Sequence, residues 1–284
     1  MNYRILNVII FLIACPLLLT GQEDEVEDLL REEIINTDPV YKPIIGIGTG
    51  VYNFYGDVRN NYINPVLGNY GYKFNVSAFL DKNRFYTLNL YFIYGQVSGN
   101  EQSVTDLSRN LNFKTDLVNF GANLEYNFDH LRKRNKSIRP FVSLGIENIQ
   151  FSPKGDLYDP SGNLYNYWSD GTIRISPESP ENFSAEILYR DFNYETDLRQ
   201  RELDLYGLGD YSKNTFAIPI DLGLNFRITE RISCKLGTSL HYTFTDYMDN
   251  VSSSGTSVKG KKGNDILSYN YLSLHFDLFS EPKT

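Results

Sequence analysis

Apolar and polar side chains alternate with a period of two along eight segments of this chain. From Val118 to Phe128, every even position is apolar, and the odd positions between them carry Asn, Gly and Glu. Because successive side chains of a β-strand point to opposite faces, this period indicates strands that separate an apolar environment from a polar one. The predicted strands are Ile44–Asp57, Tyr70–Leu80, Tyr86–Gly95, Val118–Phe128, Arg139–Phe151, Phe216–Ile228, Ile232–Phe244 and Leu272–Leu278.

Short and long connections between these strands alternate strictly along the chain. In an up-and-down meander, all the long connections therefore emerge at one end and both termini lie at the other. Even strand numbers, short periplasmic turns and long outer loops are typical of bacterial outer-membrane barrels. We predict an all-β fold, an eight-stranded antiparallel transmembrane β-barrel over residues 43–279 with a periplasmic tail at 280–284. The short connections are 81–84, 129–138 and 229–231, and the long ones are 58–69, 98–113, 152–214 and 246–265.

The polar face of the predicted strands is rich in Gly, Asn and Ser and has few long charged residues. Small polar groups suit the crowded interior of an eight-stranded barrel. A soluble barrel of lipocalin type is the alternative, but its polar face would meet water and would carry more Lys and Glu. The 22 Tyr and 18 Phe, at a mean hydropathy of −0.36, also favour strands over membrane helices.

The N-terminus has the features of an export signal, which we assign to residues 1–21. A short basic start precedes an apolar run from Ile5 to Leu19, which is shorter than the roughly twenty residues of a membrane-spanning helix. The segment ending at Cys15 also resembles a bacterial lipobox, which would leave Cys15 lipidated. We favour ordinary cleavage near Gly21 over this alternative. Together with the predicted barrel, this signal predicts that the mature chain lies in the bacterial outer membrane, in contact with its lipid.

The net charge of −8 comes mostly from the leader that follows, residues 22–42. Eight acids and one base lie between Glu23 and Asp38, so the barrel region is nearly neutral. The absence of a basic stripe argues against nucleic acid as a partner. The leader is either a flexible acidic segment or a short amphipathic helix that docks on a periplasmic partner.

Six runs of the chain share motifs with one known family, namely Gly48–Val58, Arg109–Asp116, Leu124–Phe128, Pro140–Ile146, Ala217–Leu224 and Thr243–Ser252. These runs resemble the family of small outer-membrane barrels linked to the type IX secretion system, the PorG family. The matching runs are collinear and cover most of the chain from Gly46 to Leu278. The resemblance implies an outer-membrane barrel with an accessory role in secretion or gliding machinery. The acidic leader and the 152–214 connection are both longer than the family pattern.

Charged residues at the polar positions of the strands are expected to point into the lumen. Buried charges need partners, so we expect a network of ion pairs and hydrogen bonds that fills the interior. A narrow ion-conducting path is the alternative, and a metal held by His241, His275 and Asp277 is a weaker one. If Gly237 pairs with His275 in the last hairpin, Lys235 lies opposite Asp277. The expected lumen residues are Lys73, Glu125, Glu147, Asp221, Arg227, Lys235, His241, His275 and Asp277.

A second set of residues is expected at the extracellular rim. The aspartates of this set are expected to order the loops through Asx-type hydrogen bonds, with a calcium site as the alternative. The 152–214 loop carries many aromatics among acids, which suggests a recognition surface or, alternatively, a self-packed cap over the barrel. The rim residues are Gly56, Asp57, Asp116, Asp246 and Asp249.

No catalytic motif of the Gly-x-Ser-x-Gly, His-Glu-x-x-His or phosphate-loop type is present. We therefore expect no enzymatic activity, no cofactor and no resident metal. The expected function is that of a structural, assembly or partner-binding barrel, joined to a protein partner in an envelope secretion or assembly complex. A small passive pore is the competing function, and an outer-membrane enzyme is a weaker alternative.

Overall fold

A computed structural model describes residues 42–58, 69–128, 138–199, 207–229 and 231–278. The predicted signal segment with Cys15, nearly all of the acidic leader and the C-terminal tail lie outside these described residues. Within the described ranges, no helix has the length and apolar character needed to cross a bilayer.

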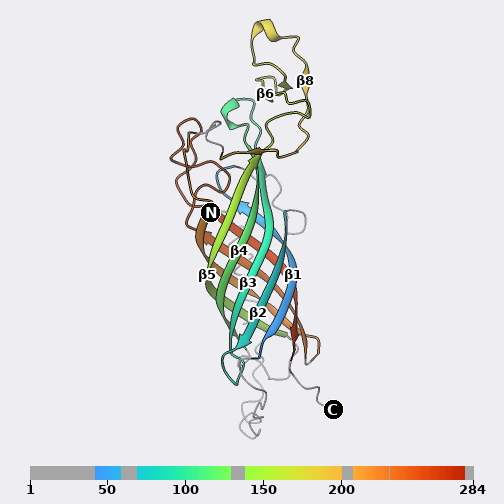
Figure 1. The fold of residues 1–284 in the computed structure, drawn as a ribbon, viewed down its shortest axis with the longest axis vertical. Helices are drawn as coiled ribbons and strands as arrows, with labels where there is room; N and C mark the ends of the chain where they lie inside the picture. Colours follow the sequence, from blue (N-terminus) through green and yellow to red (C-terminus); the bar gives the residue numbers. More distant parts are fainter. Residues whose placement is uncertain (1–41, 59–68, 129–137, 200–206, 230, 279–284) are drawn as a thin grey trace, which may run out of the picture. The chain divides into compact units, whose positions relative to one another are not determined.

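Eight long strands form one closed antiparallel barrel, which confirms the predicted fold class (Figure 1). Each strand pairs with its neighbour along the chain, and the last strand pairs with the first, so the barrel has no open edge. The barrel strands are β1 (Ile44–Tyr55), β2 (Asn69–Phe79), β3 (Tyr86–Asn100), β4 (Asn112–Asn127), β5 (Ile138–Gly155), β10 (Asn214–Arg227), β11 (Ile232–Thr243) and β12 (Ile266–Asp277).

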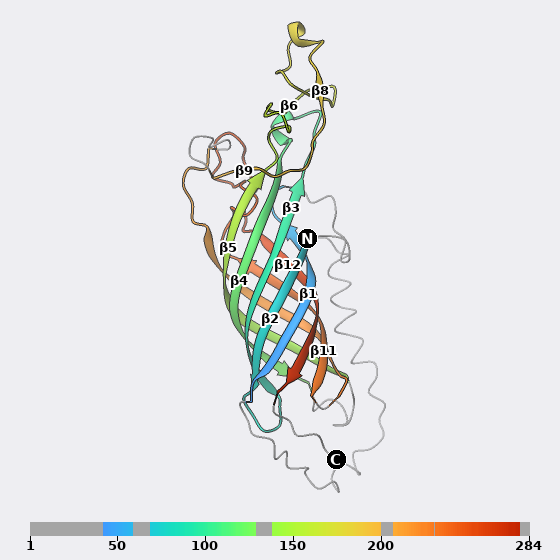
Figure 2. The same ribbon diagram turned by 45° about the vertical axis from the view of Figure 1, so that its right-hand side comes forward.

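The strands are strongly tilted, as Figures 1 and 2 show. Followed from Ile44 through the register of each neighbouring pair, the circuit returns to β1 at Phe54, a stagger of ten residues. Strand tilt and stagger are linked in a closed barrel. The interior is therefore narrow enough for inward side chains from opposite strands to meet.

The two faces of the barrel wall differ as the alternation predicts. Outward side chains are large, apolar and exposed, for example Tyr72 at 65%, Phe120 at 62% and Ile146 at 71%. Inward side chains on the same strands, such as Asn123 at 4% and Glu147 at 2%, are polar and buried. This arrangement is the reverse of a water-soluble protein, in which apolar side chains are the buried ones.

Several strands are longer than predicted at the barrel end that carries the long connections, which we call the loop end. β3 runs on to Asn100, β4 begins at Asn112, β5 runs on to Gly155 and β12 begins at Ile266. In β3 and β4 these added positions place polar side chains outward, such as Gln96 and Asp116, and apolar ones inward. The alternation is inverted there, so a search for outward apolar residues ends the strands too early.

The expected register of the last hairpin was wrong. Gly237 pairs with Tyr271, and Lys235 faces Ser273, not Asp277. The shift is four residues, an even number, so every side chain keeps its predicted face. Barrel closure fixes this register, because β12 must also pair with β1, where Asp277 faces Ile44.

The connection between β5 and β10 has secondary structure of its own. Three short strands form a separate small sheet, and a fourth, β9, adds to the end of β5. A single 3-10 turn, η2, lies in the connection between β3 and β4. The added elements are η2 (Leu107–Arg109), β6 (Asn166–Tyr167), β7 (Ile173–Arg174), η4 (Pro180–Asn182), β8 (Ile187–Leu188) and β9 (Thr196–Asp197).

Candidate functional site

The centre of the lumen holds an ion pair between opposite walls of the barrel. The Nζ atom of Lys235 on β11 lies 2.7 Å from both carboxylate oxygens of Glu125 on β4. Asn89 donates a further hydrogen bond of 3.3 Å to Glu125. Both charged side chains are almost fully buried, at 8% and 5% exposure. The pair therefore bridges the lumen.

A second buried carboxylate, Glu147 on β5, collects three partners from other strands. His241 Nδ1 lies 2.5 Å from one Glu147 oxygen, and the Tyr91 hydroxyl donates to the other at 3.0 Å. The Asn119 amide contacts both oxygens at 3.4 Å. Four strands thus meet at one carboxylate, as expected for a buried charge that needs compensation.

The remaining lumen residues have separate partners. Asp221 accepts hydrogen bonds of 2.9 Å from Asn123 and Ser143. His275 contacts Ser273, two residues away on the same strand, at 2.9 Å. The Lys73 ammonium lies 4.0 Å from the centre of the Tyr271 ring and 5.2 Å from that of Tyr91, at cation–π distance. Asp221, His275 and Lys73 therefore have separate partners and do not form one cluster.

Arg227 and Asp277, the other two expected lumen residues, lie at the opposite end of the barrel from the long loops. Arg227 is exposed and Asp277 is half-buried. His241 and His275 have different partners, Glu147 and Ser273. Among the described residues, no three His, Cys, Asp or Glu side chains are arranged to hold a metal ion.

The loop end of the lumen is closed by an apolar plug. Met248 and Val251, from the connection between β11 and β12, are fully buried there together with Val58 from the connection after β1. The Thr115 hydroxyl on β4 donates to the Met248 carbonyl at 2.6 Å and ties the plug to the wall. Inward side chains of the strands complete it, namely Phe54, Val97, Phe113, Leu117, Ile149 and Phe151.

Sequence reasoning missed this plug because it expected a polar lumen along its whole length. A signal was present at the loop ends of β3 and β5, and in β5 it lies inside the predicted strand. Val97, Ile149 and Phe151 occupy inward positions there and are apolar. The lumen therefore has two layers, a polar network in the middle and an apolar seal at the loop end.

Buried aspartates hold the plug in place through backbone N–H groups. One oxygen of Asp249 accepts from the amides of Asp57 and Val58, both at 2.9 Å, and the other accepts from Val251 at 3.0 Å. Asp57 in turn accepts from the Lys261 amide at 2.6 Å. The connections after β1 and after β11 are thereby joined.

Two further aspartates complete this group, which we call the aspartate clamp (Asp57, Asp246, Asp249 and Asp265). Asp246 accepts from Ser252 and Ser253, and Asp265 accepts from the Met248 amide at 2.9 Å. Sequence reasoning did not single out Asp265, because nothing local distinguishes it from other loop acids.

Burial raises the pKa values of three clamp members. Burial and the charge of Asp57 raise the pKa of Asp249 to about 7, against the opposing effect of its backbone donors. Burial, Asp249 and Asp246 raise the pKa of Asp265. Burial likewise raises the pKa of Asp57. The clamp therefore takes up protons more readily than exposed aspartates do.

The other two rim residues have structural contacts of different kinds. A Cβ atom on Gly56 would lie 2.2 Å from the Phe54 ring and 2.5 Å from an Asp265 oxygen, so only glycine fits there. Asp116 forms a half-exposed ion pair with Lys154 at 3.1 Å on the outside of β4 and β5.

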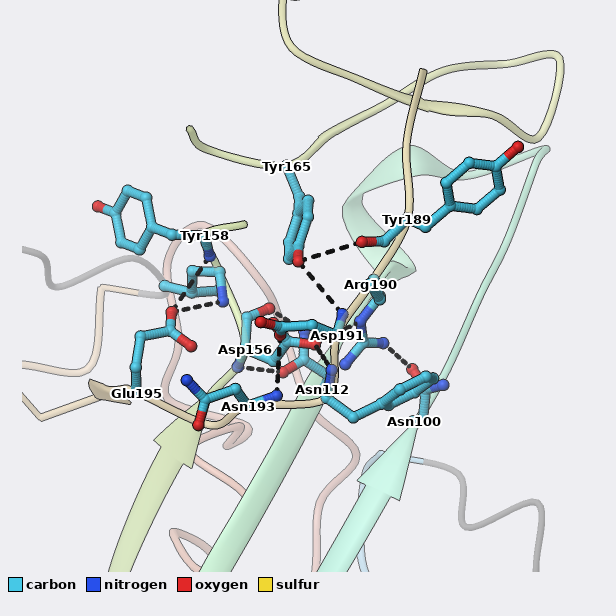
Figure 3. A network of polar contacts seen from close by, with 12 residues as sticks. Asn100, Asn112, Asp156, Tyr158, Tyr165, Tyr189, Arg190, Asp191, Asn193 and Glu195 are labelled. Atoms are coloured by element: carbon cyan, nitrogen blue, oxygen red, sulfur yellow. Dashed lines mark hydrogen bonds and ion pairs between the residues drawn. The ribbon is translucent and has the colours of Figure 1, made fainter. Parts of the chain in front are cut away.

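The β5–β10 loop is anchored at its root by a buried polar network (Figure 3). Asp156 is fully buried, and its side chain forms an ion pair with Arg190 at 2.9 Å. Asn112 at the start of β4 bonds the Asp156 backbone in both directions, at 3.0 and 2.7 Å. Glu195 accepts from two backbone amides, those of Leu157 and Tyr158. The first residues of the loop are thereby fastened to β4, and Arg190 and Glu195 from its second half are fastened to those first residues.

Beyond this root, the loop packs around one aromatic centre. Trp168 is buried at 5% exposure, and the Arg174 guanidinium lies 4.2 Å from the centre of its ring. Arg174 also pairs with Asp170 at 2.9 Å and donates to the Phe183 carbonyl. The loop is therefore partly self-packed.

The loop also leaves large apolar side chains in solvent. Phe183 is 77% exposed, Tyr189 81% and Phe192 59%. Residues 156–199 contain nine acids and three arginines, and Arg174 and Arg190 form ion pairs within the loop. The exposed surface is therefore acidic and aromatic.

Comparisons with known proteins give structural likeness only. No family model and no curated protein sequence matches the chain. Neisserial surface protein A aligns with a TM-score of 0.42 at 7% identity, over 85% of this chain and 100% of that one. Ail of Yersinia pestis aligns at 0.39 and 9%, over 84% and 99%. A major outer membrane protein of Thermus thermophilus aligns at 0.43 and 13%, over 84% and 99%. Because these TM-scores and identities are low, the barrel is described from this chain's own strands alone.

Proposed function

We propose that the protein is a bacterial outer-membrane barrel that acts as a structural or partner-binding component of the cell envelope. The belt of exposed apolar side chains around a closed barrel supports the membrane placement, since such a surface is favourable in lipid and unfavourable in water. The short turns then face the periplasm, and the loop end faces the outside.

The observation that carries the binding role is the anchored outer loop above a sealed lumen. A loop held by the buried Asp156–Arg190 pair retains its shape, yet it exposes Phe183 and Tyr189 almost completely. Exposed aromatics on an ordered scaffold are typical of recognition surfaces, because they bury much area with little loss of side-chain entropy. The plug and the polar network argue against the competing passive pore.

A link to type IX secretion or gliding machinery is the finer part of the proposal. It rests on the resemblance of the strand and loop motifs, including Thr243–Ser252, to the PorG family. In this proposal the barrel holds the protein in the membrane, and the outer loop and the periplasmic leader bind its partners.

The test is photo-crosslinking in native outer membranes followed by mass spectrometry. A photoreactive residue at Tyr189 is compared with one at Val104, an exposed apolar position of the neighbouring β3–β4 connection. We expect a recurrent protein partner from Tyr189 that is lost when Phe183 is replaced by Ser. Absence of any recurrent partner at Tyr189 overturns the binding role.

The same experiment addresses the secretion link. Recovery of secretion-channel or periplasmic ring subunits supports it, and recovery of an unrelated partner overturns it while leaving the binding role intact. Planar-bilayer recordings test the pore, since steady single-channel steps from the purified barrel contradict a sealed lumen.

A further inference from the structure

The small sheet of the outer loop, the connection between β5 and β10, has an open edge at β8 (Figure 1). The strand order is β6–β7–β8, so β8 pairs with β7 on one side, and no described strand pairs with its other side. An unpaired strand edge is a template for pairing with a further chain.

The free backbone groups of this edge belong to Ile187. The Ile175 amide donates to the Glu186 carbonyl at 3.1 Å, and Ile173 is the register partner of Leu188. Because alternate residues of an antiparallel strand bond to the same neighbour, the Ile187 N–H and C=O point away from β7. Within the described residues neither group has a hydrogen-bond partner, and Ile187 is 46% exposed. An extended peptide can therefore add to β8 at this position.

The side chains of the outer loop favour a cationic partner. The segment 156–199 has no lysine, and its three arginines are buried or half-buried. Arg174 and Arg190 are already paired with Asp170 and Asp156. Positive charge on a partner is therefore complementary to this surface, and negative charge is not. The exposed acids of the segment are Asp170, Glu178, Glu181, Glu186, Asp191 and Glu195.

An exposed aromatic ring follows directly after β8. Tyr189 is 81% exposed, and Figure 3 shows its ring pointing away from the polar network at the root of the loop. The loop's own arginines already lie over aromatic rings. Arg174 is 4.2 Å from the centre of the Trp168 ring, and Arg190 is 4.9 Å from that of Phe192. The Tyr189 ring, which lies among exposed acids, offers an arginine of a partner the same kind of contact.

We propose that the outer loop binds an extended polypeptide segment rich in arginine and apolar side chains, which adds to β8 as the next strand of the small sheet. The open edge selects an extended backbone, the exposed acids select positive charge, and Tyr189 selects arginine or an apolar side chain. The inference rests on the binding role proposed above and names the chemistry of its partner.

The test is peptide binding to the purified full chain in lipid nanodiscs, measured by fluorescence anisotropy. The probe is a labelled peptide of alternating Arg and Val, and the charge control alternates Glu and Val. Two further probes carry N-methyl groups either on every Arg or on every Val. Since alternate residues of a strand face the same neighbour, one of these two probes has its β8-facing edge blocked and the other does not.

We expect the Arg–Val peptide to bind, the Glu–Val peptide not to bind, and only one of the two N-methylated peptides to bind. Glu186→Gln is expected to weaken binding about threefold, since it removes one exposed charge partner. The matched control Ser257→Lys changes the net charge by the same amount at an exposed position of the β11–β12 connection, and it should leave binding unchanged.

Four outcomes would overturn the inference: no binding of the Arg–Val peptide, binding of the Glu–Val peptide, identical behaviour of the two N-methylated peptides, or equal effects of Glu186→Gln and Ser257→Lys. Displacement of the peptide by neutral dextran would assign the exposed ring to sugars and overturn it as well. These outcomes leave the binding role itself intact, because that role depends on whether Tyr189 crosslinks a recurrent partner in native outer membranes.

Discussion

Removing one partner of the buried Lys235–Glu125 pair provides the sharpest test of the lumen network. Lys235→Met leaves the Glu125 carboxylate buried, with Asn89 as its remaining donor at 3.3 Å. Breaking a buried ion pair by removing one partner costs about 3–5 kcal/mol, because an uncompensated charge stays in a medium of low polarity. We expect a loss of folding free energy of that size.

The double variant Lys235→Met with Glu125→Leu should recover most of the loss. Replacing a whole buried pair by apolar side chains of similar volume is often neutral or stabilising. Asn89 retains a partner there, since it also donates to Asn123 at 2.7 Å. Recovery in the double variant would separate the cost of an unpaired charge from simple loss of packing.

The matched control is Lys154→Met, which removes the ion pair with Asp116. Those side chains are 44% and 30% exposed, and exposed pairs contribute about 0–1 kcal/mol. The assay is urea unfolding in lipid vesicles, read by the heat-modifiable migration of the folded barrel on gels. Equal midpoints for Lys235→Met and Lys154→Met would refute the reasoning, as would a double variant as unstable as the single one.

Three further predictions concern the loop end. Burial raises the pKa of Asp249 to about 7, above the roughly 3.9 of an unfolded aspartate. Between about pH 3.9 and pH 7 the folded state therefore binds more protons than the unfolded state, and the folded state loses stability as the pH rises through this range. Proteolysis of the β11–β12 connection should therefore accelerate from about pH 5 to about pH 8, and Asp249→Asn should reduce this dependence; an unchanged profile in the variant would contradict it. Arg190→Met leaves Asp156 buried and unpaired, so the outer loop should be digested at least about tenfold faster while the barrel keeps its heat-modifiable migration. Arg174→Met should change the fluorescence of Trp168, the single tryptophan of the chain, and an unaltered emission spectrum would argue against the close contact between them.

The barrel was predictable from the sequence because lipid and a crowded lumen impose opposite demands on the two faces of every strand. The runs around Val118–Phe128 and Phe216–Ile228 therefore carry the period of two without exception on the lipid side. The up-and-down topology was predictable as well, since the lengths of the connections alternate strictly. The strand ends were not, because the inverted pattern near Val97 and Phe151 belongs to the plug rather than to lipid.

The pairing partners of the charged residues required the three-dimensional structure. Parity alone shows that Lys235 and Glu125 point inward, but their contact depends on the stagger of the whole barrel, to which each register contributes. The same holds for the last hairpin, whose register is set by closure against β1 rather than by its own loop. Local sequence determines which face a side chain occupies, because the strand period is local. Which inward side chains meet is a property of the closed barrel, because it requires all eight strands to be paired.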